Sequence, residues 1–326
     1  MKILFGVPYY DTNRLKYHGR QMLSYVIRRL VVSVPTVFLV VTMVFFAFQV
    51  IPGDAARMYA GDQASVAAVE AIRVELGLDQ PVGVQYLSYL KRLAVGDLGT
   101  SFITRRPVTL EIGSRFTNTA VLAFGAIIAS TFLGIFMGVM AALNRGKWLD
   151  HTLSVLAVGG ISIPVFWLGL LLMFLFSLKL HWLPTAGNAT WRHYIMPTFC
   201  LSVYSIAFIT RMARSTVLDV LGSDFVRTAE SKGLRERIIN MRHVVRNALI
   251  PLITTVGLRF GYMLGGAVVT ETVFAWPGVG RLLVIAVTQR DIPVVQGILL
   301  IFASVFVIVN IIVDVLYSVA DPRLSY

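Results

Sequence analysis

Long apolar runs alternate with shorter polar intervals along most of the chain. Six of these runs are long enough to cross a hydrocarbon core of about 30 Å as helices that rise about 1.5 Å per residue. They cover residues 30–51, 117–143, 153–178, 195–216, 249–273 and 293–319. An even number of spans leaves both ends of the chain on the same side of a membrane. The pattern therefore predicts an all-α integral membrane protein with six transmembrane helices.

The interval between the first two predicted spans, residues 52–116, is the longest. Its sequence predicts a helix over 65–76 that ends at Gly77, a turn at 79–81, and a second helix that ends near residue 94. We therefore expect an ordered helical element outside the spans rather than a plain connection.

The interval between the fourth and fifth spans, residues 217–248, is polar and basic. The pair Ser223-Asp224 can cap a short helix there by accepting hydrogen bonds from its first unpaired N–H groups. Gly233 can end that helix, because a residue without a Cβ atom adopts the left-handed conformation at no steric cost.

A second, basic helix is expected to follow, from Glu236 to about residue 249, and Pro251 opens the fifth apolar run. A short capped helix held between two spans suits docking on a cytoplasmic partner better than it suits chemistry. The alternative is an ordinary positively charged loop, since cytoplasmic loops of inner-membrane proteins are rich in Lys and Arg.

Composition agrees with the span pattern. The 326 residues are 56% hydrophobic and 14% charged, and the mean hydropathy is +0.75. Such values indicate a polytopic membrane protein rather than a soluble domain. The net charge of +12 lies in short loops rather than on a face interleaved with aromatic residues, which argues against nucleic-acid binding. The single cysteine, Cys200, cannot form an internal disulfide.

The distribution of basic residues predicts the orientation. The N-terminal tail, residues 1–29, holds six Lys and Arg residues, and the 217–248 interval is also basic. The long 52–116 interval is balanced, with seven basic and seven acidic residues. Because Lys and Arg concentrate in cytoplasmic loops, both tails (1–29 and 320–326) are expected in the cytoplasm of a bacterial inner membrane. Residues 52–116 and 274–292 are then extracytoplasmic.

No motif for catalysis or nucleotide binding is found. The glycine-rich segment 96–101 lacks the spacing and the Lys of a phosphate loop, and the chain has no zinc-protease, paired-cysteine or nucleophile-elbow motif. The five histidines are scattered through loops and termini, so surface roles are favoured over a metal site. We expect no catalytic residue, metal or cofactor in this chain.

Polar residues inside spans usually mark a pathway or a helix contact. Gly134 and Gly138 allow close helix approach, and Ser162 and Pro164 predict a kink in the third span. The residues that could line a translocation path are Ser162, Ser202, Tyr204, Ser205, Arg259, Tyr262 and Asp314. The alternative for each is a contact between helices.

Arg259 and Asp314 support a more specific prediction. Arg259 lies about 12 Å of helix beyond Pro251, and Asp314 lies about 10 Å before Asp321, so both are expected at similar depth. An isolated charge there would be costly. The two side chains are therefore predicted to pair or to share a hydrated vestibule. The alternative is that each reaches the interface separately.

Several motifs resemble those of one family. The 217–248 interval and the start of the fifth span resemble the coupling loop of binding-protein-dependent ABC permeases. The matching residues are Arg227-Thr228-Ala229, Gly233, Arg246-Asn247-Ala248 and Pro251. Arg227 and Thr228 replace the Glu-Ala of the general pattern, and the longer spacing to Pro251 is typical of the peptide/nickel branch. Further segments also resemble that branch. They are ELGLDQP, QYLSYL and GDLGTS in the 52–116 interval, ETVFAWPGVGRL and RDIPVVQG near the last span, and DVLY and DPR at the end of the chain. The similarity covers about residues 22–326.

The resemblance implies a type I ABC importer permease with a large extracytoplasmic loop between spans one and two. Such a subunit pairs with a homologous second permease, two cytoplasmic ATPases that bind ATP and Mg, and an extracytoplasmic binding protein. Peptides are the expected cargo, with nickel chelates or glutathione as alternatives. A secondary transporter would need coupling-ion carboxylates near the middle of the membrane, and a membrane enzyme would need convergent catalytic groups. Neither pattern is present.

The resemblance also assigns residues to roles. The expected ATPase-coupling residues are Phe225, Arg227, Thr228, Ala229, Lys232 and Gly233. Phe225 and Ala229 lie four residues apart, so they share a helix face that could fill a cleft of the ATPase, while Arg227 and Lys232 could contact its acidic rim. The expected binding-protein docking residues are Asp97, Gly99, Trp276 and Pro277. The alternative for the outer segment is a cap that only packs on the spans.

Overall fold

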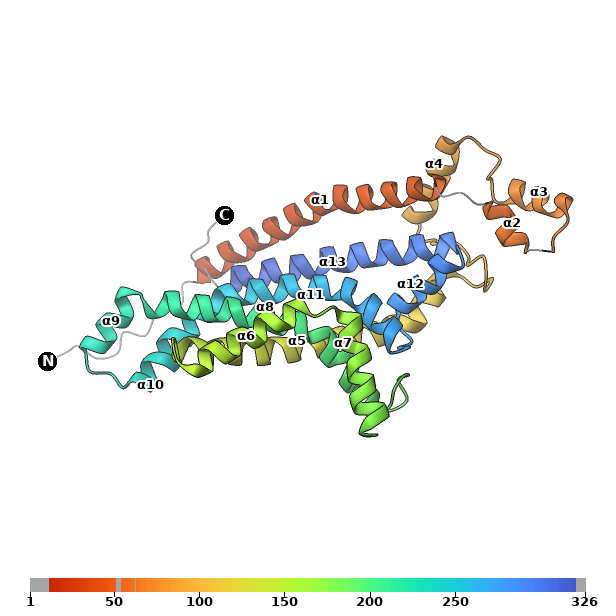
Figure 1. Cartoon of the computed structure of the whole chain (residues 1–326). Coiled ribbons are helices and arrows are strands. Elements are labelled where there is room, and N and C mark those ends of the chain that lie inside the picture. Colours follow the sequence, from red (N-terminus) through yellow and green to blue (C-terminus); the bar gives the residue numbers. More distant parts are fainter. Residues whose placement is uncertain (1–11, 51–53, 62, 321–326) are drawn as a thin grey trace.

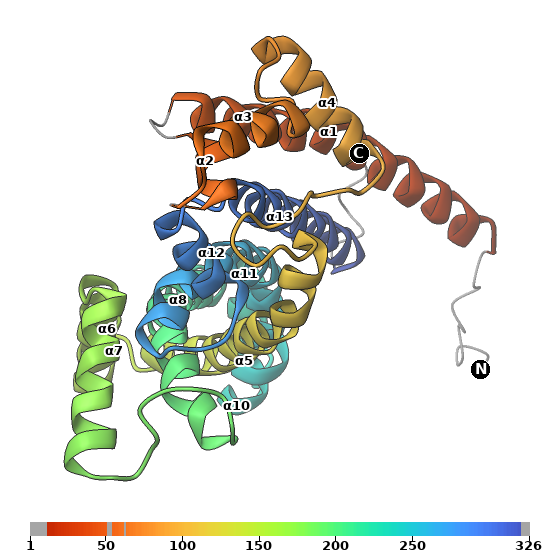
Figure 2. The ribbon, with the colours of Figure 1, turned by 90° about the vertical axis from the view of Figure 1, so that its right-hand side faces the viewer.

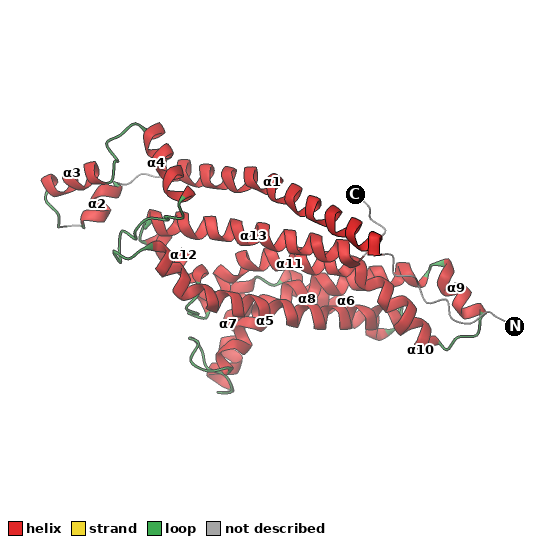
Figure 3. Cartoon of the chain, turned by 180° about the vertical axis from the view of Figure 1, so that it is seen from behind, coloured by secondary structure: helices red, strands yellow, loops and turns green. Residues whose placement is uncertain are grey.

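The computed structural model describes residues 12–50, 54–61 and 63–320. This part of the chain is almost wholly helical, as Figure 3 shows by its colouring. An isolated antiparallel bridge joins Thr100 to Pro107. The helical character follows from the composition, because apolar segments in a membrane must satisfy every backbone polar group internally.

The described chain has five long helices, and they lie side by side (Figure 1). Their bounds are Thr12–Val50 for α1, Val108–Leu143 for α5, Arg192–Leu221 for α8, Arg246–Val273 for α11 and Ile292–Ala320 for α13. Among the described residues, four of them are long and apolar enough to cross a membrane. Two bent helix pairs, one of them within α11, bring the number to six if each is one span.

The third predicted span is broken. It consists of α6 (Trp148–Ser162), then α7 (Val165–Leu172) and the π-helical segment η1 (Met173–Lys179), and the two parts meet at 105°. Pro164 has no N–H and disfavours helical geometry at the preceding residue, so Ile163 is extended, with φ −83° and ψ 122°. As a result α7 points away from the other helices (Figure 1).

The most extensive helix packing in the described chain joins α5 to α8. Gly134 and Gly138 lie against Ile209 and Ala213 of α8. A Cβ atom at Gly138 would lie 2.5 Å from the Cβ of Ala213, and one at Gly134 would lie 2.8 Å from the Cβ of Ile209. This small-residue stripe therefore lets the two backbones approach closely.

The molecule has two distinct ends. One end carries three short helices, α2 (Ala55–Ala60), α3 (Val66–Glu75) and α4 (Val82–Ala94), and we call it the α2–α4 end. The other carries α9 (Asp224–Ser231), and we call it the α9 end. Seen along the long helices, α1 and the three short helices lie together at the top and the other long helices form the centre (Figure 2).

The short helices follow local signals in the 52–116 interval. The helix predicted over 65–76 lies at Val66–Glu75, where the Ser65 hydroxyl accepts a hydrogen bond from the N–H of Ala68. Gly77 follows with φ +65°. The sequence interpretation missed α2, although Asp54 caps it by accepting hydrogen bonds from the N–H groups of Ala56 and Arg57.

The basic segment after α9 differs from the prediction. One helical run extends from α10 (Glu236–Ile238) through the π-helical η2 (Ile239–Val245) into α11, so Pro251 lies inside a helix. Its position in the second turn of α11 removes one backbone hydrogen bond, which membrane helices tolerate where neighbours pack closely. The chain therefore reaches α11 without the break expected at Pro251.

Candidate functional site

The α9 helix is fixed to the end of the helix bundle. Its residues Val226 and Ala229 are buried against the ends of α5 and α8 and against η2. The cluster that they join contains Ala142, Val217, Ile239, Val244 and Ala248. An exposed helix held by an apolar face on three neighbours moves together with them, because close packing transmits displacement.

The rest of the α9 surface is exposed. Phe225 is 45% exposed, and Arg227, Thr228 and Lys232 are exposed as well. The predicted pairing of Phe225 with Ala229 as one partner-facing surface is wrong, because Ala229 is only 8% exposed and packs on its own chain. The four-residue spacing placed both on one side of the helix, but the helix turns its Val226 and Ala229 edge inward.

The boundaries of α9 use the expected residues in partly different ways. Ser223 occupies the N-cap position, but its hydroxyl donates a hydrogen bond to the carbonyl of Val220 instead of accepting one from the helix. Gly233 has φ +72°, and a left-handed residue is needed there to end the helix. Arg227 lies 3.9 Å from Asp224, and both side chains are well exposed.

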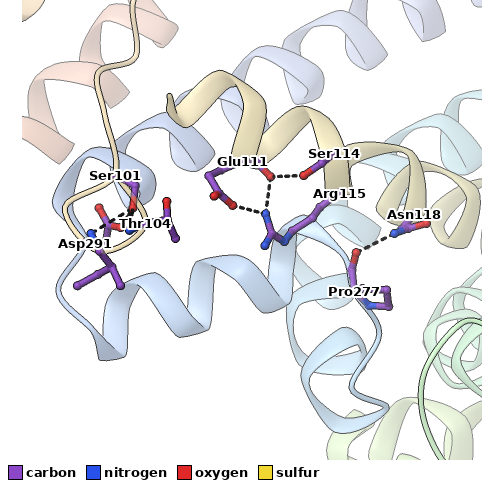
Figure 4. A network of polar contacts seen from close by, with 9 residues as sticks. Ser101, Thr104, Glu111, Ser114, Arg115, Asn118, Pro277 and Asp291 are labelled. Atoms are coloured by element: carbon purple, nitrogen blue, oxygen red, sulfur yellow. Dashed lines mark hydrogen bonds and ion pairs between the residues drawn. The ribbon is translucent and has the colours of Figure 1, made fainter. Parts of the chain in front are cut away.

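A polar network joins the start of α5 to the turn before α13 at the α2–α4 end (Figure 4). The carboxylate of buried Asp291 accepts a 2.5 Å hydrogen bond from the hydroxyl of Ser101 and a 3.0 Å bond from the N–H of Phe102. Farther along α5, buried Glu111 pairs with Arg115. The end of the glycine-rich segment 96–101 is therefore hydrogen-bonded to Asp291, a residue distant in the sequence.

A second buried carboxylate, Glu271, holds the turn after α11. It is fully buried and accepts a 2.6 Å hydrogen bond from the hydroxyl of Thr119 and a 3.0 Å bond from the N–H of Arg281. A Cβ atom at Gly278 would lie 2.3 Å from its carboxyl group, and one at Gly280 would lie 3.0 Å from its Oε2 and 2.6 Å from the Cα of Val268. The Pro-Gly-x-Gly turn is thus wrapped around one carboxylate, and helix α12 (Val279–Thr288) starts from it.

The four predicted docking residues lie in different environments at the α2–α4 end. Asp97 is exposed and accepts a hydrogen bond from the N–H of Gly99, and both line a cavity of about 1290 Å³ beside α1, α4 and α13. Trp276 is fully buried against α5, and its indole N–H donates to the carbonyl of Asn118. Its prediction as a contact residue is therefore wrong. Pro277 is partly buried, and its carbonyl accepts from Asn118.

The structure separates the predicted path serines. Ser202 and Ser205 of α8 are buried, and the Ser202 hydroxyl donates to carbonyls of Ala126 in α5 and Thr198 in its own helix. The bond from Ser202 to α5 is a contact between helices, which was the alternative for this residue. Ser162 is exposed at the end of α6 and donates to the carbonyl of Val158.

Arg259 lies among aromatic rings. Its guanidinium carbon is 3.4 Å from the ring centre of Phe208, 5.3 Å from that of Tyr262 and 5.6 Å from that of Tyr204. Tyr204 and Tyr262 are 43% and 67% exposed. The predicted path residues Tyr204, Arg259 and Tyr262 therefore form one group on α8 and α11.

Asp314 does not join that group. Its Oδ2 atom lies 3.0 Å from the Nε of Arg29 in α1, so the predicted pairing with Arg259 is wrong. The depth estimate placed both residues on neighbouring helices, but α13 also packs along α1, and the tail residue Arg29 belongs to that helix.

An ion pair that sequence reasoning missed lies closer to the α9 end. The Nε and Nη2 atoms of Arg214 donate hydrogen bonds to the two carboxylate oxygens of Asp150, at 2.6 and 2.8 Å. Asp150 is buried and also accepts from the N–H of Gly146. The signal was an arginine inside a predicted span, which needs a partner.

Comparison with known proteins agrees with this geometry. Residues 130–326 match the family described as "Binding-protein-dependent transport system inner membrane component", and residues 22–123 match its N-terminal companion. The glutathione transport system permease protein GsiC of Salmonella choleraesuis (strain SC-B67) is 45% identical over 94% of this chain and 100% of its own length. The GsiC protein of Escherichia coli (strain K12) is 44% identical over the same shares.

Solved structures share the fold. Two crystal forms of the MetNI methionine ABC transporter in inward-facing conformations superpose with TM-scores of 0.53 and 0.56, at 17% and 16% identity. They cover 63% and 64% of this chain and 93% and 95% of their own chains. The helix arrangement is therefore that of a type I importer permease.

Proposed function

The chain belongs to the binding-protein-dependent transport system inner membrane component family, as a peptide/nickel-type ABC importer permease, and from this premise we propose that it imports short peptides. Glutathione, itself a tripeptide, is the first candidate, because the GsiC relatives carry that name at 44 to 45% identity. A multi-pass inner-membrane subunit of this kind provides a path and no catalytic residue.

The observation that carries the proposal is the two-faced α9 helix. Val226 and Ala229 tie it to the membrane helices, and Phe225, Arg227 and Lys232 face outward. Such a helix suits a rigid connection to a cytoplasmic ATPase. Phe225 would enter an apolar cleft of the ATPase, and the two cations would contact its acidic rim. ATP and Mg would be bound by the ATPase subunits and not by this chain.

The remaining partners follow from the two ends. If the α9 end is cytoplasmic, as the excess of Lys and Arg there supports, both tails are cytoplasmic and the α2–α4 end faces outward. The cavity beside Asp97 and Gly99 would then receive part of an extracytoplasmic binding protein. A homologous second permease would complete the path as a heterodimer, and ATP binding would bias a two-state opening.

Co-purification tests the coupling surface. The tagged chain is extracted in detergent as wild type, Phe225→Asp and Val66→Asp, the last a matched change at a valine that is 85% exposed on α3. We expect ATPase subunits with wild type and with Val66→Asp, and at least ten-fold less with Phe225→Asp at equal expression. Equal ATPase recovery with Phe225→Asp would mean that another surface couples the subunits.

Uptake tests the substrate. Cells that express the complete importer should accumulate labelled glutathione and dipeptides only with an intact ATPase and binding protein. Uptake of a nickel chelate in their place would favour the alternative cargo. Uptake that persists without the ATPase would identify a secondary transporter and overturn the proposal.

A further inference from the structure

Arg259, Tyr204 and Tyr262 belong neither to the α9 coupling surface nor to the predicted docking residues. Arg259 lies thirteen residues from the start of α11 and fourteen from its end, about 20 Å of helix on either side. A guanidinium at this depth needs protein or water around it, because lipid tails cannot solvate its charge.

Arg259 has no carboxylate partner in the part of the chain that the structure describes. Its Nε atom is buried and forms no hydrogen bond, and Asp314 is paired with Arg29. The face of Phe208 covers one side of the guanidinium at 3.4 Å. Stacking of this kind satisfies the face of the cation and leaves its N–H edge for an anion.

Arg259, Tyr204 and Tyr262 lie beside rows of exposed residues on α8 and α11. On α11 the exposed residues Leu258, Tyr262, Gly265 and Val269 follow one another by three or four positions, which places them on one helix face. On α8, exposed Tyr204 and Arg211 are seven residues apart and share a face in the same way. Two tyrosines and two arginines thus lie on these neighbouring helices, and lipid tails cannot solvate the guanidinium groups.

We propose that Arg259, with Tyr204 and Tyr262, binds the C-terminal carboxylate of the transported peptide on its way through the membrane. The guanidinium edge matches a carboxylate as a bidentate donor, and the tyrosine hydroxyls add donors beside it. The site attracts the C-terminal carboxylate, a group that short peptides carry whatever their side chains. This inference rests on the proposed function, and it assigns the substrate contact to specific residues of the path.

Paired substrates test the site. The complete complex, purified through a tag on this chain, is placed in proteoliposomes with its binding protein and ATP. Uptake of glutathione is compared with uptake of its glycyl ethyl ester, and uptake of dialanine with that of dialanine amide. Each rate is divided by the wild-type rate for the same compound, which removes differences in delivery by the binding protein.

For Arg259→Gln we expect uptake of the free acids to fall at least ten-fold, while uptake of the ester and amide falls less than two-fold. Arg259→Lys should retain more acid uptake than Arg259→Gln, because lysine keeps the positive charge although it cannot form the bidentate hydrogen bonds of a guanidinium. Arg192→Gln is the matched control, since Arg192 lies over Trp191 at the outer end of α8, and it should change the acid-to-ester ratio less than two-fold.

Any of four results would overturn this inference. Equal loss of acid and ester uptake would make Arg259 a structural residue, and unchanged acid uptake would remove it from the path. Loss of the second permease from the purified Arg259→Gln complex would show that Arg259 pairs across the subunit interface. Wild-type vesicles that take up none of these compounds would overturn the proposed function itself, and this inference with it.

Discussion

The hydroxyl of Thr119 lies 2.6 Å from Oε1 of Glu271 and donates to it, while also accepting a hydrogen bond from the N–H of Val279. One buried threonine thus links α5 to the end of α11 and to the start of α12. The turn between α11 and α12 is held from inside by side chains that are wholly shielded from solvent.

Glu271→Ala should therefore destabilise the protein strongly. The change leaves the N–H of Arg281 and the hydroxyl of Thr119 without their acceptor, at a cost of about 1–3 kcal/mol for each buried group. Thermal unfolding in detergent measures the loss. Glu75→Ala, at an exposed position on α3, is the control and should leave the melting temperature unchanged. Equal melting temperatures for the two variants would contradict a stabilising role of the buried Glu271 hydrogen bonds.

Arg214→Ala should lower the free energy of unfolding by about 3 kcal/mol, because it leaves the buried Asp150 carboxylate without its partner. Arg211→Ala removes the same side chain from an exposed position of the same helix and should have little effect. The comparison uses denaturation of the purified protein. A loss of the same size in both variants would mean that the ion pair adds no specific stability.

Gly138→Ala should weaken the packing of α5 on α8. Its new methyl group would collide with Ala213 and the carbonyl of Thr210, and overpacking of this kind costs about 1–3 kcal/mol. Gly113→Ala is the matched control in the same helix, because no other atom lies within 4 Å of its Cβ position. That control should be neutral or slightly stabilising, since alanine favours helices. A stabilised Gly138→Ala would show that the two helices pack less closely.

A double-mutant cycle on Asp314 should distinguish its two possible partners. Arg29 and Asp314 are 49% and 26% exposed, so their coupling energy is expected to be small, about 0.2–1 kcal/mol. Arg259 and Asp314 should show additive effects to within about 0.3–0.5 kcal/mol, since they do not interact. The measured quantity is the unfolding free energy of single and double Gln and Asn variants. A larger coupling for Arg259 than for Arg29 would reverse the assignment.

The sequence was sufficient for the fold class and the family. Long apolar runs predicted the membrane helices, because span length depends only on bilayer thickness and helix rise. The motifs around Gly233 and the Pro-Gly-x-Gly turn identified an ABC importer permease of the peptide/nickel type, and the family match and the GsiC relatives confirm it. Glutathione was retained as an alternative cargo, and the relatives make it the first substrate to test.

Several residues could not be placed from the chain alone. The spacing of Phe225 and Ala229 correctly predicted a shared helix region, but only the packing of α9 decides which edge turns inward. Trp276 follows a span and reads as a loop aromatic, yet the turn folds it back against α5. Helical periodicity states which residues share a face and leaves open what that face touches.

By itself the sequence determined the helical membrane fold class and the family, since these depend on local hydrophobicity and on short motifs. The tertiary structure decided the partners of the charged residues. Asp314 meets Arg29, Arg214 meets Asp150, and Arg259 remains beside aromatic rings. The reason is physical, because each pairing joins helices that lie far apart in the chain, and such neighbours are set by how whole helices pack.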